Sequence, residues 1–186
     1  LLLEAKREAE AGNIVVGAAH DMQLQNIRLL PVLYNAITDK KVIQFDYKPY
    51  DKEPFCVSLH PQYLKEYNGR WFVLGQTDGD MTEVKTYPID RIISKIIELD
   101  DRNYVSAPAG FYREYFRDIV GVRHTKNRKA FDIVIRTHSI YHHGLVTTKP
   151  FHHSQLERTP FGVHEDGEYG ELQIHVEPTV ESVGKI

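Results

Sequence analysis

Five histidines in the second half of the chain are the first candidates for metal or acid–base chemistry. They are His138, His142, His143, His152 and His153. On a helix, His138 and His142 would point to one side, because they are four residues apart. Zinc would need a third or fourth ligand, often Cys, Asp or Glu, and no carboxylate stands at that spacing. Solvated or hydrogen-bonding histidines are therefore favoured, with a metal site as the alternative.

The single cysteine, Cys56, could be a nucleophile only beside a positioned base. The chain has no G-x-G-x-x-G, no Walker lysine loop, no G-x-S-x-G and no paired cysteines. We therefore expect a protein that is not an enzyme and needs no cofactor. A hydrolase or metal enzyme that uses Cys56 or the histidines is the alternative, and it predicts bound metal or a reactive thiol.

Cationic and aromatic residues in the first half offer binding chemistry instead. Asp90 and Arg91 follow a predicted strand, and an arginine there can bind a phosphate or carboxylate with two hydrogen bonds. Arg91 could equally pair with Asp90. His60, Tyr63 and Lys65 lie close together in "SLHPQYLKEY", and such residues on a β-surface suit stacked bases and phosphates. The alternative is that the tyrosines pack within the sheet.

Composition sets limits on the class of protein. The 186 residues are 41% hydrophobic and 26% charged, which is typical of one large or two small globular domains. The net charge of -3 argues against a protein whose whole surface attracts nucleic acid. A local basic patch is compatible with this net charge. No apolar run is long enough for a bilayer, so we expect no membrane partner. A lone cysteine forms no intrachain disulfide, which suits the reducing cytoplasm.

The first half reads as one helix followed by short strands. Leu30, Leu33, Tyr34 and Ile37 have the spacing of an amphipathic helix, and Pro31 suits its first turn. Alternating strand patterns then occupy residues 42–47, 55–61, 62–67, 70–75, 82–88 and 93–99. Asn68-Gly69 is the strongest hairpin signal, because both residues tolerate the conformations of a type I′ turn. The pattern predicts a small, strongly bent antiparallel sheet or barrel.

The second half reads as a compact α+β unit. A linker and a helical turn over residues 112–116 precede a strand at 130–136, a helix at 139–146, a polar segment at 152–160 and a strand at 171–178. We interpret this as a β-α-β-β order. The predicted organisation is therefore a linker helix remnant in 1–23, including a helix from Glu4 to Ala11, a first domain in 24–105 and a second in 106–186.

Three separated motifs together resemble the WYL domain. They are "VIQFDY", "LHPQYLKEYNGRWFVLG" and "YPIDRI", and the match covers about residues 24–100. The Trp-Tyr-Leu that names the family is here Trp71-Phe72-Val73. A basic residue, an aromatic and Asp-Arg-Ile appear as Lys85, Tyr87 and Asp90-Arg91-Ile92. "FYREYFRDIVGV" and "TKPFHHSQ" resemble the C-terminal extension that often follows this domain.

The resemblance implies an SH3- or Sm-like small β-barrel followed by a ferredoxin-like α+β extension. It also implies part of a bacterial transcriptional regulator, usually a homodimer that contacts DNA through an N-terminal winged helix-turn-helix, which is not recognisable here. The WYL domain would sense a nucleotide or single-stranded nucleic acid. The expected ligand-binding residues are Tyr47, His60, Tyr63, Lys65, Lys85 and Arg91.

The chain departs from the family pattern around Pro61. Many WYL domains have Arg four residues before this proline and His just after it, where this chain has Val57 and Gln62. Part of the basic pocket is therefore rearranged. Trp71 is predicted to pack in the core rather than to touch ligand. The alternative function is an interaction and dimerisation module without a small ligand, which predicts that Arg91 is tied up in internal pairing.

Overall fold

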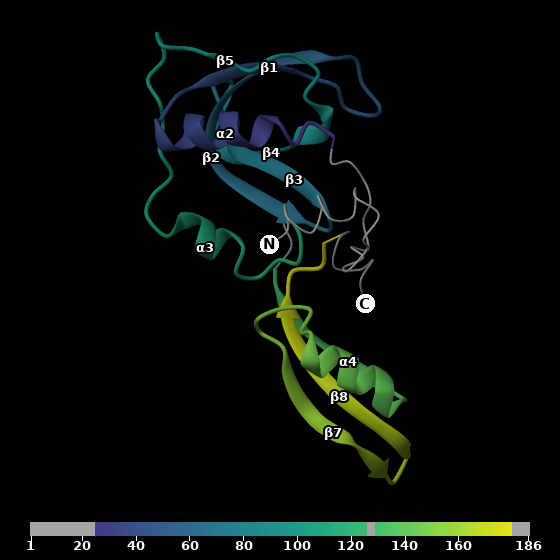
Figure 1. Cartoon of the computed structure of the whole chain (residues 1–186). Coiled ribbons are helices and arrows are strands. Elements are labelled where there is room, and N and C mark those ends of the chain that lie inside the picture. Colours follow the sequence, from purple (N-terminus) through teal and green to yellow (C-terminus); the bar gives the residue numbers. More distant parts are fainter. Residues whose placement is uncertain (1–24, 126–128, 180–186) are drawn as a thin grey trace, which may run out of the picture.

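The computed structural model describes residues 25–125 and 129–179, which form two β-sheet units (Figure 1). The first unit contains α2 (Leu29–Thr38), β1 (Ile43–Tyr47), β2 (Phe55–Tyr67), β3 (Arg70–Thr77), β4 (Asp80–Pro88), the 3-10 turn η1 (Ile89–Arg91) and β5 (Ile97–Glu98). Helix α3 (Phe111–Tyr115) lies between the two units in the sequence. The second unit contains β6 (Phe131–Thr137), α4 (Ile140–Thr148), β7 (Leu156–His164) and β8 (Gly167–Val176). In these residues no helix combines the length and apolarity needed to cross a membrane.

The hairpin predicted at Asn68-Gly69 is confirmed and joins β2 to β3. Asn68 has φ of 52° and Gly69 has φ of 74°, and Tyr67 pairs directly with Arg70. Positive φ at both central residues of a two-residue loop is the type I′ geometry, whose twist matches that of the flanking strands. The predicted helix at 30–37 is also confirmed as α2, with Pro31 in its first turn.

Strand β2 is longer than the sequence indicated, because the two predicted strands at 55–61 and 62–67 are continuous. The register shifts between Pro61 and Tyr63, so Gln62 is an extra residue that opposes no partner on β3. Such a β-bulge reverses the alternation of side chains along a strand. Val57 and Leu59 before the bulge therefore contact the same core as Leu64 after it.

Two hydrophobic clusters lie on opposite faces of this sheet. The first joins α2 to the sheet through Leu33 and Ala36, together with Ile43, Phe45 and other buried strand residues. Trp71 packs against this cluster, half-buried, as predicted. The second cluster places Phe72 and Leu74 of β3 against Tyr112 of α3 and Val122. The helical turn expected near Tyr112 is therefore confirmed as α3, and it packs on the sheet of the first unit.

The first sheet is not a closed barrel. Its strands follow the order β4-β3-β2-β1-β5, with every pairing antiparallel, and β4 and β5 form its two edges. The strand predicted over residues 93–99 is reduced to Ile97–Glu98. An isolated bridge between Tyr47 and Ile92 brings the end of η1 against β1 without extending a ladder. The expectation of a barrel is corrected to an open, bent sheet.

The second unit has the predicted β-α-β-β order, in a sheet with the strand order β6-β8-β7. The polar segment predicted at 152–160 instead contains the start of β7, which begins at Leu156. His143 of α4 is buried and contacts Thr137 Oγ1 at 2.8 Å and Glu157 Oε1 at 2.8 Å. His143 therefore fixes α4 to both β6 and β7.

His138 and His142 do not form the helical pair on which the alternative of a metal site depended. His138 precedes α4, which begins at Ile140, so His138 and His142 do not share a helix face. Within residues 25–125 and 129–179, no group of three His, Cys, Asp or Glu residues has metal-binding geometry. The thiol of Cys56 is exposed on β2. The helix predicted at Glu4–Ala11 and the end of the chain beyond residue 179 lie outside the described residues.

The connection between the units is fixed by the buried imidazole of His60. Its Nε2 lies 2.9 Å from Asp78 Oδ1, and its Nδ1 accepts the backbone N–H of Val105 at 3.1 Å. Tyr104 adds a hydrogen bond from its hydroxyl to the carbonyl oxygen of Pro61, at 2.6 Å. Farther along the chain, Arg123 Nη2 donates to the carbonyl oxygen of Thr86 at 3.0 Å. The segment after β5 is therefore tied to the first sheet by specific hydrogen bonds.

We predict that Gly75→Ala strongly destabilises the protein. Gly75 lies opposite Pro61 beside the bulge, and a Cβ there would overlap the backbone carbonyl oxygen of His60. Overpacking against backbone is expected to lower the free energy of unfolding by about 3 kcal/mol. Gly79→Ala is the matched control, because a Cβ at Gly79 would meet no atom within 4 Å. Urea denaturation of the two variants measures the difference, and equal midpoints would contradict the packing described here.

A second prediction concerns His60→Ala. The substitution leaves the N–H of Val105 without its acceptor, so the free energy of unfolding should fall by roughly 2–3 kcal/mol. His153→Ala is the control, since His153 is exposed. Thermal or urea unfolding followed by circular dichroism checks the prediction. A His60 variant as stable as the His153 variant would show that the connection does not depend on this imidazole.

Candidate ligand-binding site

The turn η1 presents Arg91 directly after β4, at the strand end where the sequence placed it. The amide of Asn26 holds this turn by donating to the carbonyl oxygens of Ile89 at 3.1 Å and Ile92 at 2.8 Å. The N–H of Lys48 donates to the carbonyl oxygen of Arg91 at 3.0 Å. The backbone of Arg91 is therefore held by hydrogen bonds from two directions.

The guanidinium of Arg91 stacks on an aromatic ring and has no carboxylate partner among the described residues. Its Cζ lies 3.2 Å from the centroid of the Tyr50 ring, and its buried Nε has no hydrogen-bond partner. Asp90 is the partner that the sequence offered as an alternative for Arg91. Its Oδ1 instead lies 3.5 Å from Nε of Arg70. An unpaired, half-buried guanidinium is suited to a phosphate or carboxylate, because its planar fork can donate two parallel hydrogen bonds.

Tyr50 completes this arrangement and was missed by the sequence analysis. Its side chain is 76% exposed, although one face of the ring is covered by Arg91. An exposed aromatic face can stack on a base or another planar ring. The signal available in the sequence was weak, because Tyr50 lies in a connection between strands, where no side-chain periodicity relates it to Arg91.

Tyr63 and Lys65 lie together, on a surface shared with α3. The Tyr63 ring stacks on Tyr112 with a centroid distance of 4.7 Å, and Lys65 Nζ lies 3.9 Å from the centroid of Phe116. Burial lowers the pKa of Lys65, because its ammonium is partly removed from water. Tyr63 is 39% exposed, so part of this aromatic surface is accessible to a ligand.

The other three expected residues are engaged within the protein. Tyr47 is buried in the first core and packs edge-to-face on Tyr87, at 5.0 Å between ring centroids. His60 is buried with both ring nitrogens bonded. Lys85 Nζ lies 2.7 Å from Asp80 and 3.0 Å from Glu83, and these hydrogen bonds, that of Asp80 first, raise its pKa. The six expected residues therefore do not form one surface.

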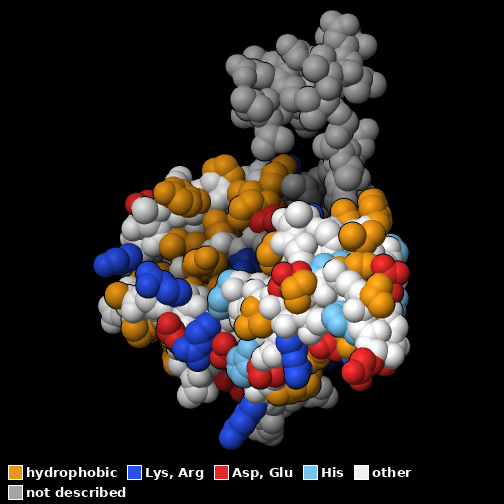
Figure 2. Space-filling model, turned by 90° about the horizontal axis from the view of Figure 1, so that it is seen from below, with side chains coloured by type: hydrophobic (Ala, Val, Ile, Leu, Met, Phe, Trp, Pro, Cys, Tyr) orange, Lys and Arg blue, Asp and Glu red, His pale blue; other side chains and the backbone are white. Residues whose placement is uncertain are grey.

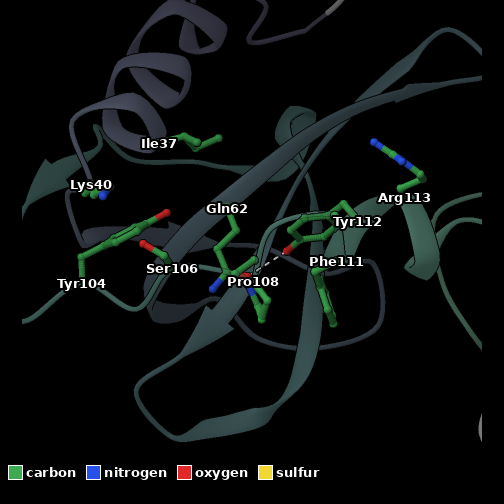
Figure 3. Close-up of a pocket in the computed structure, with 11 residues that line it drawn as sticks. Ile37, Lys40, Gln62, Tyr104, Ser106, Pro108, Phe111, Tyr112 and Arg113 are labelled. Atoms are coloured by element: carbon green, nitrogen blue, oxygen red, sulfur yellow. Dashed lines mark hydrogen bonds between the residues drawn. The ribbon is translucent and has the colours of Figure 1, made fainter.

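A hollow of about 310 Å³ lies elsewhere, between the end of α2, the bulge of β2 and the connection to the second unit (Figure 3). Gln62 lines it and is hydrogen-bonded within the protein: its Nε2 donates to the carbonyl oxygen of Val105 at 2.9 Å, and its Oε1 accepts the Tyr112 hydroxyl at 2.9 Å. Lys40 and Arg113 are exposed at its lining. Because the amide of Gln62 is already paired with protein groups, it is not free to recognise a ligand in this hollow.

The charges on the remaining surface are mixed. Figure 2 shows Lys and Arg side chains among Asp and Glu on the face seen from below, as expected for a net charge of -3. Arg102 and Arg117, for example, pair with Asp78 and Glu114. Neutralised cations attract a ligand less than an unpaired one. In the described residues Arg91 is unpaired, and its guanidinium is also held against an aromatic ring, which makes it a candidate for binding an anion.

Comparison with known proteins agrees with the motifs in the first unit. The WYL domain family matches residues 28–96, from just before α2 to just before β5. Protein PafB of Mycobacterium leprae is 28% identical over 82 residues, which are 44% of this chain and 24% of that protein. The chain therefore spans about a quarter of that relative's length.

Among solved structures, the proteasome accessory factor B/C (PafBC) of Arthrobacter aurescens overlaps 94% of this chain and 26% of its own, with a TM-score of 0.48 and 14% identity. That overlap is too loose to transfer the role of any residue. The match over residues 28–96 agrees with the range of about 24–100 indicated by the three motifs. This chain therefore contains a WYL domain, formed by the first of its two units.

Proposed function

We propose that the chain is the ligand-sensing regulatory part of a bacterial transcriptional regulator, with a nucleotide or single-stranded nucleic acid as effector. The match to the WYL domain supports the regulatory role, because the resemblance to this family implies part of such a regulator. The observation that carries the ligand proposal is the Arg91 guanidinium, which stacks on exposed Tyr50 and lacks a carboxylate partner in the described residues. The protein acts by binding and not by catalysis.

The proposed binding mode uses charge and stacking together. The Nη groups of Arg91 hold a phosphate, and the exposed face of Tyr50 receives the attached base. A longer oligonucleotide has a second contact surface at Tyr63 and Lys65, where aromatic rings and an ammonium lie side by side. Lys85 contributes only if its pairing with Asp80 is exchanged for the ligand.

The proposed signal passes from the ligand to an N-terminal DNA-binding domain, across a cytoplasmic homodimer. A ligand shifts such an assembly only if it binds one arrangement more tightly than the other. The aromatic contacts of Tyr63 with α3 link the ligand-facing sheet to the connection between the units. We further propose that the open sheet is a derivative of the SH3- or Sm-like barrel, and that the β-α-β-β unit belongs to a ferredoxin-like fold.

Arg91→Ala tests the ligand proposal. Loss of charge-assisted hydrogen bonds should weaken binding of a labelled single-stranded oligonucleotide by about ten- to one-hundredfold, and should make the remaining binding less sensitive to salt. Tyr50→Ala should weaken binding by about fivefold or more, whereas Tyr50→Phe, which keeps the ring, should bind nearly as the parent does. Fluorescence anisotropy at two salt concentrations measures these affinities.

Arg158→Ala is the control for net charge, because Arg158 lies on β7 and is exposed. It should bind oligonucleotide as tightly as the parent. Failure of the parent to bind any single-stranded DNA, RNA or mononucleotide at low salt would overturn the proposed ligand class. Equal losses of affinity in the Arg91 and Arg158 variants would indicate that the oligonucleotide binds only by non-specific electrostatic attraction.

A further inference from the structure

The turn η1, which carries Arg91, is attached to a distant part of the chain by one side chain. Nδ2 of Asn26 donates to the carbonyl oxygen of Ile89 at 3.1 Å and to that of Ile92 at 2.8 Å, and these residues are 63 and 66 positions away. Ile89 begins the turn and Ile92 follows its last residue, so the two hydrogen bonds flank Arg91. A side-chain amide has two N–H donors, and Asn26 uses both to hold this turn.

The backbone of Asn26 belongs to a different element. Its carbonyl oxygen accepts the N–H of Leu29 at 2.8 Å, in the turn that leads into α2. Its φ of 60° is in the left-handed region, which Asn and Gly adopt more readily than other residues. Asn26 therefore joins the start of α2, through its backbone, to the turn that carries Arg91, through its side chain.

The connection between β1 and β2 also holds the turn. Lys48 donates its backbone N–H to the carbonyl oxygen of Arg91 at 3.0 Å. The same connection contains Tyr50, whose ring centroid lies 3.2 Å from Cζ of Arg91. The guanidinium therefore stays over this ring only while the turn and the connection keep their relative positions. Asn26 supplies a hydrogen-bonded attachment of the turn that does not involve the connection.

Loss of the Asn26 amide should shift the turn without unfolding the protein. The side chains of Ile89 and Ile92 are buried and pack in the first hydrophobic cluster. These contacts keep the turn on the sheet, whereas its two carbonyl oxygens would lose their donor and move to find another. A guanidinium that is no longer held in place binds a phosphate more weakly, because ordering it on binding costs free energy.

The position of Asn26 in the chain gives this contact a second consequence. The chain enters α2 through residues 25–28, and the proposed function places a DNA-binding domain on the N-terminal side of that helix. Two hydrogen bonds would transmit a movement of η1 on ligand binding to residue 26. Because such coupling is reciprocal, a change in the segment that precedes α2 would alter the affinity of the Arg91 site by the same free energy.

We propose that Asn26 couples the Arg91 site to the entry of α2. It positions the guanidinium for an anionic ligand, and through it binding at Arg91 acts on the chain that precedes the helix. This role rests on the proposed function and deepens it, because it names the residue through which the site is regulated. Asn26 is a positioning residue, since it acts through the turn and not by touching the ligand.

Asn26→Gly tests the positioning role, because glycine keeps the left-handed backbone and removes the amide. The variant should bind a labelled single-stranded oligonucleotide about five- to tenfold more weakly than the parent, since two hydrogen bonds no longer hold the turn. Asn68→Gly is the matched control: Asn68 also has a left-handed backbone, with φ of 52°, and lies at the tip of the β2–β3 hairpin. It should bind as the parent does, and circular dichroism checks that both variants fold.

A double-mutant cycle separates positioning from general destabilisation. Asn26→Gly should weaken oligonucleotide binding in the parent but have little effect when Arg91→Ala is already present, because the guanidinium that Asn26 positions is then absent. A loss of affinity of the same size in both backgrounds would overturn the inference.

A spin label measures the effect on the entry of α2. Gln25→Cys carries the label in a Cys56→Ser background, because Gln25 is exposed and Cys56 is the native thiol. Saturating oligonucleotide should change the mobility of this label, measured by electron paramagnetic resonance. The change should be lost when Asn26→Gly is added, even at an oligonucleotide concentration that saturates the variant. No change in the first protein, or equal changes in both, would overturn the coupling.

The outcomes distinguish this inference from the ligand proposal. Binding that depends on Arg91 but is the same in Asn26→Gly and Asn68→Gly keeps the ligand proposal and overturns the role of Asn26. If the parent binds neither oligonucleotide nor mononucleotide, the ligand proposal fails, and NMR signals of the Arg91 side chain, which the Tyr50 ring shifts, decide the positioning role. Asn26→Gly should move these signals toward those of an exposed arginine, whereas Asn68→Gly should not. Unchanged signals in Asn26→Gly would overturn the inference.

Discussion

The extra residue in β2 is the local feature on which the arrangement of the first unit depends. Because Gln62 opposes no residue of β3, the strand presents Val57 and Leu59 to one core before the bulge and turns Tyr63 and Lys65 to the other face after it. One strand thus contributes to two hydrophobic clusters. The amide of Gln62 then binds Val105 and Tyr112, so the distortion also positions the connection to the second unit.

The same distortion separates the residues that the sequence predicted to form one binding surface. Tyr63 and Lys65 contact α3, while Arg91 lies at the end of β4, on a turn held by Asn26. Several cations in the described residues are paired with carboxylates, as Lys85 is with Asp80. Arg91 differs because its neighbour is an aromatic ring, which attracts a guanidinium without satisfying its hydrogen-bond donors. The proposed ligand site therefore depends on the guanidinium of Arg91, whose position is fixed and whose charge is not neutralised by a carboxylate of the described residues.

In the second unit, polar contacts as well as a hydrophobic core hold the helix against the sheet. Buried His143 joins α4 to β6 and β7, and Gly170 gives this imidazole room, because a Cβ there would collide with it. One edge of the sheet is protected by Pro160 and bulges, whereas β6 remains regular.

Features that depend on neighbouring residues could be predicted from the sequence: α2, the Asn68-Gly69 turn, the alternation of β1, the β-α-β-β order and the WYL domain. Contacts in the folded protein were needed to show that β2 is continuous through a bulge, that the sheet stays open, that His60 is buried, and that Arg91 contacts Tyr50 and not Asp90. These outcomes depend on contacts between residues distant in sequence. Alternation along one strand predicts the face of the sheet on which a side chain lies, but it does not predict which residues pack against that face.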